Sequence, residues 1–220
     1  MLYFEERQQI IQTCKKLQAC EYFLGTWGNV SMRVGDHIIL TPSKVEYDLL
    51  KEEDMVVISL DGNVVEGERT PTSEKEVHRA IYNIREDVGA VVHSHTLCCM
   101  AVSALASLKE VPALTEEMSQ LLGGAIPLTK TYVAAGNHHA LGEAAAESIG
   151  KAGGVILRNH GGVASGRNLD EAVLTAKVME KSCRLYLMIR GTGDMQVIPE
   201  EYVQSENYRY HYAYGHEQGV

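Results

Sequence analysis

Short extended segments separated by tight turns occupy residues 29–65. Gly35-Asp36 and Asp61-Gly62 separate neighbouring segments, and an Asp-Gly pair between apolar runs is a strong hairpin signal. The segments are rich in β-branched and aliphatic residues and lie at residues 29–34, 37–40, 55–60 and 63–65. This part of the chain is therefore predicted to form antiparallel strands.

Beyond Thr70-Pro71 the pattern changes to helices that alternate with strands. Ser73 and Glu76 have the spacing of a capping box, and apolar residues at helical spacing follow them. Strands are expected at residues 90–95, 155–158 and 163–165, and helices up to about residue 18 and at 97–107, 137–150 and 168–190. We predict an α/β fold, a three-layer sandwich in which helices cover a mostly antiparallel central sheet.

The chain has the size and composition of one globular domain. Its 220 residues are 45% hydrophobic and 22% charged, which suffices for a sizeable core and excludes disorder as the main state. No repeat or Pro/Ser-rich linker divides it, so we expect residues 1–220 to form a single domain. A tyrosine-rich C-terminal tail is expected from about residue 200.

Charge and cysteine usage limit the partners. Lys and Arg total 20 against 29 Asp and Glu, and no basic cluster is dense enough to predict nucleic-acid binding. No apolar run has the length of a membrane span, and the first residues are unlike a secretory signal. The five cysteines lack paired spacings, which is typical of a reducing cytoplasm. A small anionic substrate stays compatible with the negative charge, because the local field of a pocket decides its binding.

His93-Ser94-His95 ends one of the expected strands. Side chains alternate across a strand, so His93 and His95 share a face on which they could bind one divalent cation. Alone, such a pair more often reflects packed or solvated histidines. His160 beside a Gly-Gly pair and Glu74 at a helix start, where we expect it to be exposed, complete a set of three imidazoles and one carboxylate that suits catalytic zinc. Glu74 has a second interpretation, as a carboxylate favourably placed by the helix dipole.

Three segments rich in Gly, Ser and Thr form a second constellation, at residues 28–31, 41–43 and 72–73. Backbone N–H groups at a helix start, together with hydroxyls, can hold an anion without many positive charges. Such residues are also typical of turns and helix caps, and by themselves they favour turns and caps over an anion site. A metal and an anion site that meet at residues 72–74 would indicate chemistry on a phosphorylated carbonyl compound.

The motifs resemble the class II aldolase/adducin family, which includes L-fuculose-phosphate aldolases and L-ribulose-5-phosphate 4-epimerases. They occur in the family's order between about residues 25 and 187, as Gly28-Asn29-Val30-Ser31, Thr41-Pro42-Ser43, Pro71-Thr72-Ser73-Glu74, Val91-Val92-His93-Ser94-His95 and Asn159-His160-Gly161. The resemblance implies one Zn²⁺ per chain, held by Glu74, His93, His95 and His160, with Glu74 also acting as acid/base. It further implies a homotetramer with active sites between subunits, and a small phosphorylated sugar as substrate. The residues implied in binding its phosphate are Asn29, Ser43, Thr72 and Ser73, and we add Gly28 and Lys44 beside them as further candidates.

The implied activity is that of a zinc-dependent aldolase that cleaves or forms a C–C bond in a small ketose phosphate. Zinc would polarise the carbonyl and stabilise an enediolate. The other electron sink, a lysine Schiff base, needs a desolvated lysine, and Lys44 and Lys130 are weak candidates. A retroaldol 4-epimerase is the first alternative, and a sugar-phosphate dehydratase or decarboxylase is the second. An adducin-like module without catalysis would lack a reason to carry the complete ligand set.

The chain departs from the family pattern at three places. Lys44 stands where the phosphate loop usually has Gly, so it either supplies charge to the phosphate or is a solvated surface lysine. Glu116 and Glu117 lie in a segment that resembles the one reaching a neighbouring subunit's site, although an exposed acidic pair fits as well. Tyr214 in the tail resembles the epimerase tyrosine that moves a proton, although a tail tyrosine also suits interface packing. Glu116, Glu117 and Tyr214 are the candidates for a second acid/base.

Overall fold

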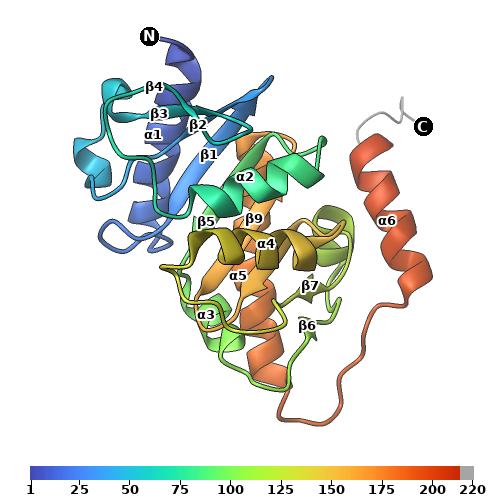
Figure 1. Ribbon diagram of the computed structural model, residues 1–220. Helices are drawn as coiled ribbons and strands as arrows, with labels where there is room; N and C mark the ends of the chain where they lie inside the picture. The colour runs from blue at the N-terminus through green and yellow to red at the C-terminus, as the bar shows by residue number, and fades with distance from the viewer. Residues whose placement is uncertain (214–220) are drawn as a thin grey trace.

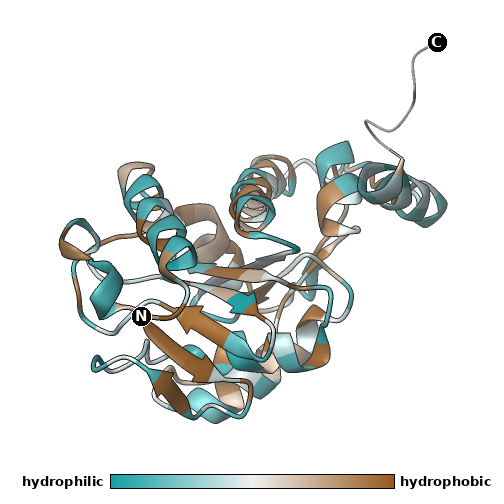
Figure 2. Cartoon of the chain, turned by 90° about the horizontal axis from the view of Figure 1, so that it is seen from above, coloured by the Kyte–Doolittle hydropathy of each residue, from teal (hydrophilic) through white to brown (hydrophobic). Residues whose placement is uncertain are grey.

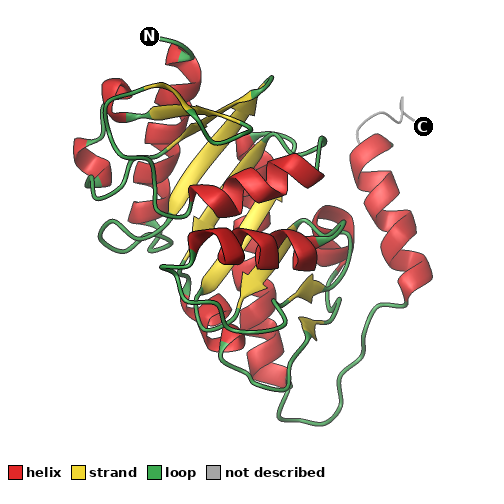
Figure 3. Ribbon diagram, viewed as in Figure 1, coloured by secondary structure: helices red, strands yellow, loops and turns green. Residues whose placement is uncertain are grey.

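The computed structural model describes residues 1–213. Within this part, seven strands form one sheet in which every neighbouring pair is antiparallel. Across the sheet the order is β4 (Val64–Glu66), β3 (Val56–Ser59), β2 (His37–Leu40), β1 (Asn29–Val34), β5 (Ala90–Ser94), β9 (Gly161–Gly166) and β8 (Gly154–Leu157). A small second sheet pairs β6 (Glu110–Val111) with β7 (Ile126–Pro127). Figure 3 shows the large sheet crossing the molecule between helices.

Helices cover both faces of this sheet. In Figure 1, α2 (Lys75–Ile84) and α4 (His138–Ile149) lie side by side in front of it. The opposite face is covered by α1 (Phe4–Ala19), α3 (Leu97–Ser103) and α5 (Leu169–Ile189), whose buried residues belong to a second hydrophobic cluster. Seen from above, with apolar residues in brown, the strands lie between two helical layers (Figure 2). The predicted three-layer sandwich with an antiparallel sheet is therefore confirmed.

The strands are apolar on both faces because both faces are covered. Ile38 and Leu40 pack in the α2/α4 cluster, whereas Ile39 between them packs in the cluster of α1, α3 and α5. Val91 and Val92 on β5 divide in the same way. Consecutive side chains of a strand point to opposite faces, so a sheet covered twice requires unbroken apolar runs. This division also assigns odd-numbered residues of β5 to the α2 side, the side on which His93 follows Val91.

Several local predictions need correction. The capping box does not form, because Glu76 pairs with Lys75 and Arg79, and α2 has no side-chain cap. The helix expected over residues 97–107 ends at Ser103.

The C-terminal tail contains a helix that the sequence pattern did not reveal, α6 (Glu200–Tyr212). It packs on the π-helical turn η3 (Met118–Leu122), where the Asn207 amide donates to the Gln120 carbonyl at 2.9 Å. Among residues 1–213, no helix is both long enough and apolar enough to cross a bilayer.

Candidate metal centre and active site

The ends of two strands and the start of one helix position the four expected metal ligands. His93 lies near the end of β5 and His95 directly follows that strand. His160 precedes β9, in a turn where Asn159 has a φ of 52° and the His160 N–H bonds the Leu157 carbonyl. Glu74 is the residue before α2. Because β5 and β9 pair antiparallel, with Ser94 opposite Gly162, the end of one strand meets the start of the other.

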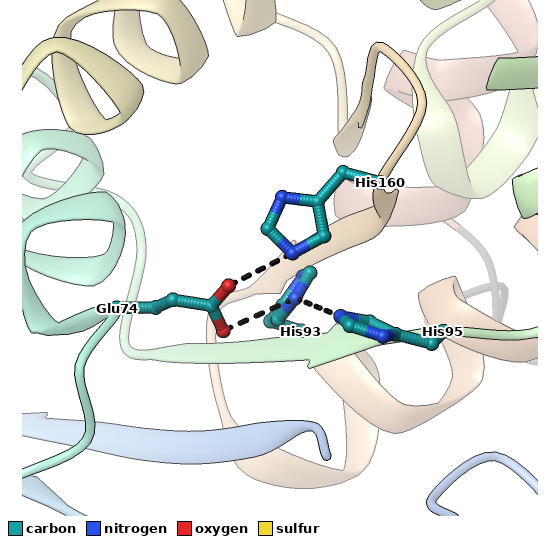
Figure 4. A group of neighbouring side chains, drawn as sticks. All are labelled: Glu74, His93, His95 and His160. Atoms are coloured by element: carbon teal, nitrogen blue, oxygen red, sulfur yellow. Dashed lines mark hydrogen bonds and ion pairs between the residues drawn. The ribbon is translucent and has the colours of Figure 1, made fainter. Parts of the chain in front are cut away.

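The four side chains converge (Figure 4), and one ligand atom from each lies within 4.8 Å of all the others. Glu74 Oε1 is 2.9 Å from His160 Nε2, and Glu74 Oε2 is 3.2 Å from His93 Nε2. His93 Nε2 is also 2.9 Å from His95 Nε2. The sequence-based grouping of these four residues thus matches their positions in the fold.

The hydrogen bonding of His93 tests whether the group suits a cation. Its Nδ1 lies 3.0 Å from the Gly162 carbonyl, which can only accept, so Nδ1 carries the proton and Nε2 of the neutral ring presents a lone pair. That lone pair faces a carboxylate oxygen of Glu74, and two acceptors at 3.2 Å repel each other unless a cation lies between them. A carbonyl behind a metal-binding imidazole is also the usual arrangement around protein metal sites. The residues therefore fit a divalent metal held by three nitrogens and one carboxylate.

Burial keeps these groups in the forms that bind a metal. It lowers the pKa of His93, whose side chain is 1% exposed, and lowers the pKa of His95 to about 3. Burial opposes ionisation of Glu74, but the adjacent His93 and His160 and the Asn29 amide hold the pKa of this carboxyl well below its usual range. At neutral pH the centre therefore holds an ionised carboxylate beside the neutral rings of His93 and His95.

The expectation that Glu74 is exposed at the helix start is wrong. Its side chain is only 10% exposed, and Oε2 accepts a hydrogen bond from Asn29 Nδ2 at 2.7 Å. The antiparallel pairing of β1 and β5 explains this contact, since Asn29 lies opposite His93 and so faces the same side of the sheet. A carboxylate in this position belongs to the floor of the site.

The three segments rich in Gly, Ser and Thr meet beside the metal ligands. Thr41 and Val30 exchange hydrogen bonds where β1 starts and β2 ends. The Ser43 N–H bonds the Thr70 carbonyl, and the Thr72 N–H bonds the Thr41 carbonyl. Ser73 is exposed, Ser43 is partly exposed and Thr72 is buried. Hydroxyls and backbone N–H groups of distant segments thus gather next to Glu74.

Two residues in or next to these segments, Gly28 and Lys44, have backbone conformations typical of glycine. Gly28 has a φ of 101°, and a Cβ there would lie 2.3 Å from a Phe23 ring carbon. Lys44 has a φ of 60° and an exposed side chain. A left-handed conformation costs a non-glycine residue roughly 1–2 kcal/mol. The loop therefore retains the backbone shape that the family's glycine would give it.

Comparison with known proteins supports the assignment that this geometry suggests. The sequence profile described as "Class II Aldolase and Adducin N-terminal domain" matches residues 8–187, which contain all four ligands. The chain belongs to this family. The predicted membership and the expected aldolase, lyase-type enzyme class are confirmed.

Named relatives of this class II aldolase cover nearly the whole chain. An "L-fuculose phosphate aldolase" of Methanocaldococcus jannaschii is 37% identical over 83% of this chain and 96% of its own length. A "5-deoxy-D-ribulose 1-phosphate aldolase" of Bacillus thuringiensis is 33% identical over 93% and 95%. A solved structure of an "L-fuculose 1-phosphate aldolase" superposes with a TM-score of 0.89 at 29% identity, covering 96% of this chain and 98% of the other.

Two of the candidates for a second acid/base, Glu117 and Glu116, lie outside the metal cluster of this aldolase. Glu117 pairs with Lys181 at 2.5 Å, and the hydrogen bond from Lys181 lowers the pKa of the Glu117 carboxyl. Glu116 accepts from the Gln120 amide. Tyr214 lies outside the described residues. The expected role of a second acid/base at the site of a neighbouring subunit stays a prediction for these three residues.

The sequence analysis missed two kinds of residue at the aldolase site. The first is a buried pair behind Asn29, formed by His78 and Tyr82, which are hydrogen-bonded to Ser31. Its signal was a polar residue every four positions from Glu74 along α2, which places all of them on one helix face. The second is Trp27, whose ring lies 6.4 Å from the His95 ring and nearly parallel to it, although the residue is 61% exposed. Nothing in the sequence around Trp27 indicated that contact.

Proposed function

We propose that this family member is a zinc-dependent aldolase that cleaves or forms a C–C bond in a small ketose phosphate. The cluster of Glu74, His93, His95 and His160 carries the proposal, because it joins a divalent-metal ligand set to a carboxylate that can also move a proton. The relatives' names indicate the substrate class, since both the fuculose phosphate and the deoxyribulose phosphate are ketose phosphates.

A bound metal would withdraw electron density from the substrate's carbonyl oxygen and so lower the energy of a carbanion beside it. The chain's own residues supply the rest. Glu74 is ionised and buried, so it can accept the proton from the carbon next to that carbonyl and return it. Asn29 donates to Oε2 of Glu74 and fixes the orientation of the carboxylate. Schiff-base chemistry is disfavoured, because Lys130 pairs with Glu147 at the surface and Lys44 is exposed.

We assign the substrate's phosphate to the loops beside the metal cluster. Ser43, Thr72 and Ser73 supply hydroxyls there, and Lys44 supplies a positive charge at the rim. Gly28 has a positive φ that favours glycine, and its lack of a side chain would let the backbone approach the phosphate closely. Asn29 differs from the others, because both ends of its amide bond protein groups. We therefore propose a shared role for Asn29, in which it bonds Glu74 and lines the floor of the phosphate site.

We also propose a homotetramer in which the tail and the segment of Glu116 and Glu117 serve a neighbouring subunit's site. The end of α6, at His211 and Tyr212, lines a cavity with Val88 and Gly166. This is the opposite end of β5 and β9 from His93, since Ala90 pairs with Gly166 and Ser94 with Gly162. Sedimentation should give four chains per particle, and a fully active monomer would contradict the shared site.

A cytoplasmic location and a single domain complete the proposal. All five cysteines are free thiols, and this suits a reducing compartment; Cys99 and Cys183, whose sulfurs are 3.7 Å apart, share a hydrogen bond and not a disulfide. The family match leaves out the tail, but α6 packs on η3 and buries Val203, so we treat residues 1–220 as one domain.

The deciding experiment incubates zinc-loaded protein with a panel of ketose phosphates and identifies the products by mass spectrometry and NMR. Release of dihydroxyacetone phosphate and an aldehyde is the expected result. An epimerised ketose phosphate would replace the proposal with the retroaldol epimerase, and loss of water or carbon dioxide would replace it with the dehydratase or decarboxylase. No turnover of any member of the panel by zinc-loaded protein would contradict an aldolase.

A further inference from the structure

Behind the metal centre, polar side chains of β1 and α2 form one continuous buried hydrogen-bonded chain. His78 Nε2 lies 2.5 Å from Asn29 Oδ1, and Ser31 Oγ lies 2.6 Å from His78 Nδ1. The Tyr82 hydroxyl lies 2.8 Å from Ser31 Oγ and 3.1 Å from the Ser31 carbonyl. All four side chains are 3% exposed or less. Each of these buried polar groups is hydrogen-bonded, and removing one member would leave its neighbour with a costly unpaired group.

The two elements bring these residues together by their periodicities. Asn29 and Ser31 are two positions apart on β1 and share the face that α2 covers. His78 and Tyr82 lie four and eight positions after Glu74, on one face of α2. The strand and the helix thus interleave, and Asn29 ends up between Glu74 and His78.

The Asn29 amide fixes the direction of the hydrogen bonds in the chain. Its Nδ2 donates to Oε2 of Glu74, so the amide oxygen faces His78 and can only accept. His78 therefore donates from Nε2. Burial lowers the pKa of His78 to about 3, so the ring is neutral and its Nδ1 can only accept. The Ser31 hydroxyl then donates to Nδ1, and the Tyr82 hydroxyl donates to Ser31.

We propose that His78 is a positioning residue which, supported by Ser31 and Tyr82, locks the Asn29 amide in the orientation that holds Glu74 for metal binding and proton transfer. An Asn29 amide without this lock could turn over and present its oxygen to the carboxylate. Partners of this kind, one contact behind the metal ligands, typically change metal affinity or activity by about 10- to 100-fold. The effect on turnover rests on the proposed aldolase function, whereas the effect on metal affinity does not.

The test compares His78→Phe with His78→Gln, because a glutamine amide can still donate to Asn29 Oδ1 and a phenyl ring cannot. Zn²⁺ affinity is measured by competition with a chromogenic chelator, and kcat and KM at saturating zinc. We expect His78→Phe to lose about 10- to 100-fold in zinc affinity and to lower kcat even at saturating zinc. We expect His78→Gln to recover most of both losses.

Val77→Ala is the matched control, since Val77 is the buried apolar neighbour of His78 on α2 and lies outside the hydrogen-bonded chain. It should lower Tm while leaving zinc affinity and kcat unchanged. If His78→Phe does not fold, Ser31→Ala provides the second test, because it removes the donor to Nδ1 and frees His78 to change tautomer. Wild-type zinc affinity in a folded His78→Phe or Ser31→Ala variant, or no recovery in His78→Gln, would overturn the proposal. Absence of aldolase turnover in the wild type would refute the proposed function alone, and the zinc affinities would still decide the role of His78.

Discussion

Asn29 lies directly opposite His93 in the antiparallel pairing of β1 and β5, so the two side chains leave the sheet on the same face. One belongs to the Gly-Asn-Val-Ser segment expected to contact the substrate's phosphate, and the other is a candidate metal ligand. Their pairing fixes the spacing between the two halves of the site through backbone hydrogen bonds. Glu74 closes the arrangement, because it contacts both Asn29 and His93.

The metal content of single-site variants tests the ligand set. Wild-type protein should contain about one zinc per chain. His160→Ala removes a nitrogen 2.9 Å from Glu74 and should lose most of the metal, as should His93→Ala. His139→Ala is the control, because the His139 side chain is 72% exposed and pairs with Glu143. Elemental analysis showing equal zinc in the wild type and His160→Ala would refute the assignment.

Glu74→Gln separates proton transfer from metal binding. With zinc saturating, turnover should still fall by about 10²–10⁴-fold, which is the usual contribution of general acid–base catalysis. The substrate's proton beside the carbonyl should also stop exchanging with deuterated water. Glu76→Gln, a change of the same kind on the same helix, should leave turnover unchanged, because Glu76 pairs with Lys75 and Arg79 and lies outside the metal cluster. Near-normal turnover and exchange in saturated Glu74→Gln would move the base to Glu117, Glu116 or Tyr214.

The tryptophan fluorescence should report metal binding directly. Trp27 is the chain's single tryptophan, and its ring lies 6.4 Å from that of His95. Cu²⁺ or Co²⁺ at the cluster should therefore quench its emission with a stoichiometry of about one ion per chain, since both ions quench nearby fluorophores efficiently. His95→Ala should weaken this saturable quenching. A titration curve unaffected by His95→Ala would show that the ion responsible for quenching binds elsewhere.

The buried His78 should make the metal-free protein less stable at acidic pH. Its pKa is about 3 when folded, against about 6.5 in an unfolded chain, so below pH 6.5 the unfolded state binds a proton that the folded state excludes. The contribution of the neutral His78 to the free energy of unfolding is fully present above pH 6.5. It is lost progressively as the pH falls toward 3, and the loss is about 2 kcal/mol at pH 5. Urea unfolding at pH 7.5 and 5, at one protein concentration, should show a smaller loss for His78→Gln. Equal losses in the two proteins would contradict this linkage.

The backbone at Lys44 predicts a stabilising substitution. Lys44→Gly should raise the free energy of unfolding by up to about 1 kcal/mol, because glycine adopts a φ of 60° without strain. Lys51→Gly is the control. Because Lys51 has a φ of −121°, which needs no glycine, this substitution should lower the free energy of unfolding. Thermal unfolding of the two variants checks the sign. An increased KM of Lys44→Gly for a ketose phosphate would further indicate that the Lys44 charge assists phosphate binding.

Much of the fold was predictable because its signals are local. The bounds of β1 and β2 agree with the expected segments, since apolar runs between Gly-Asp turns need little more than the side-chain alternation of a strand. The helix α6 was not predictable in this way. Its sequence is polar and rich in tyrosine, and packing on η3, with Val203 as its buried residue, supports it instead of a regular apolar stripe.

The sequence by itself determined which residues form the candidate metal centre, because two histidines on alternate strand positions share a face and the ordered motifs supplied Glu74 and His160. Only the tertiary structure decided how those residues act. The burial of Glu74, the direction of the Asn29 amide and the chain through His78 depend on the register of β1 against β5 and on the helix that covers them. Ionisation and hydrogen-bond direction are set by neighbours far apart in the chain, and a linear pattern records the residues without recording those neighbours.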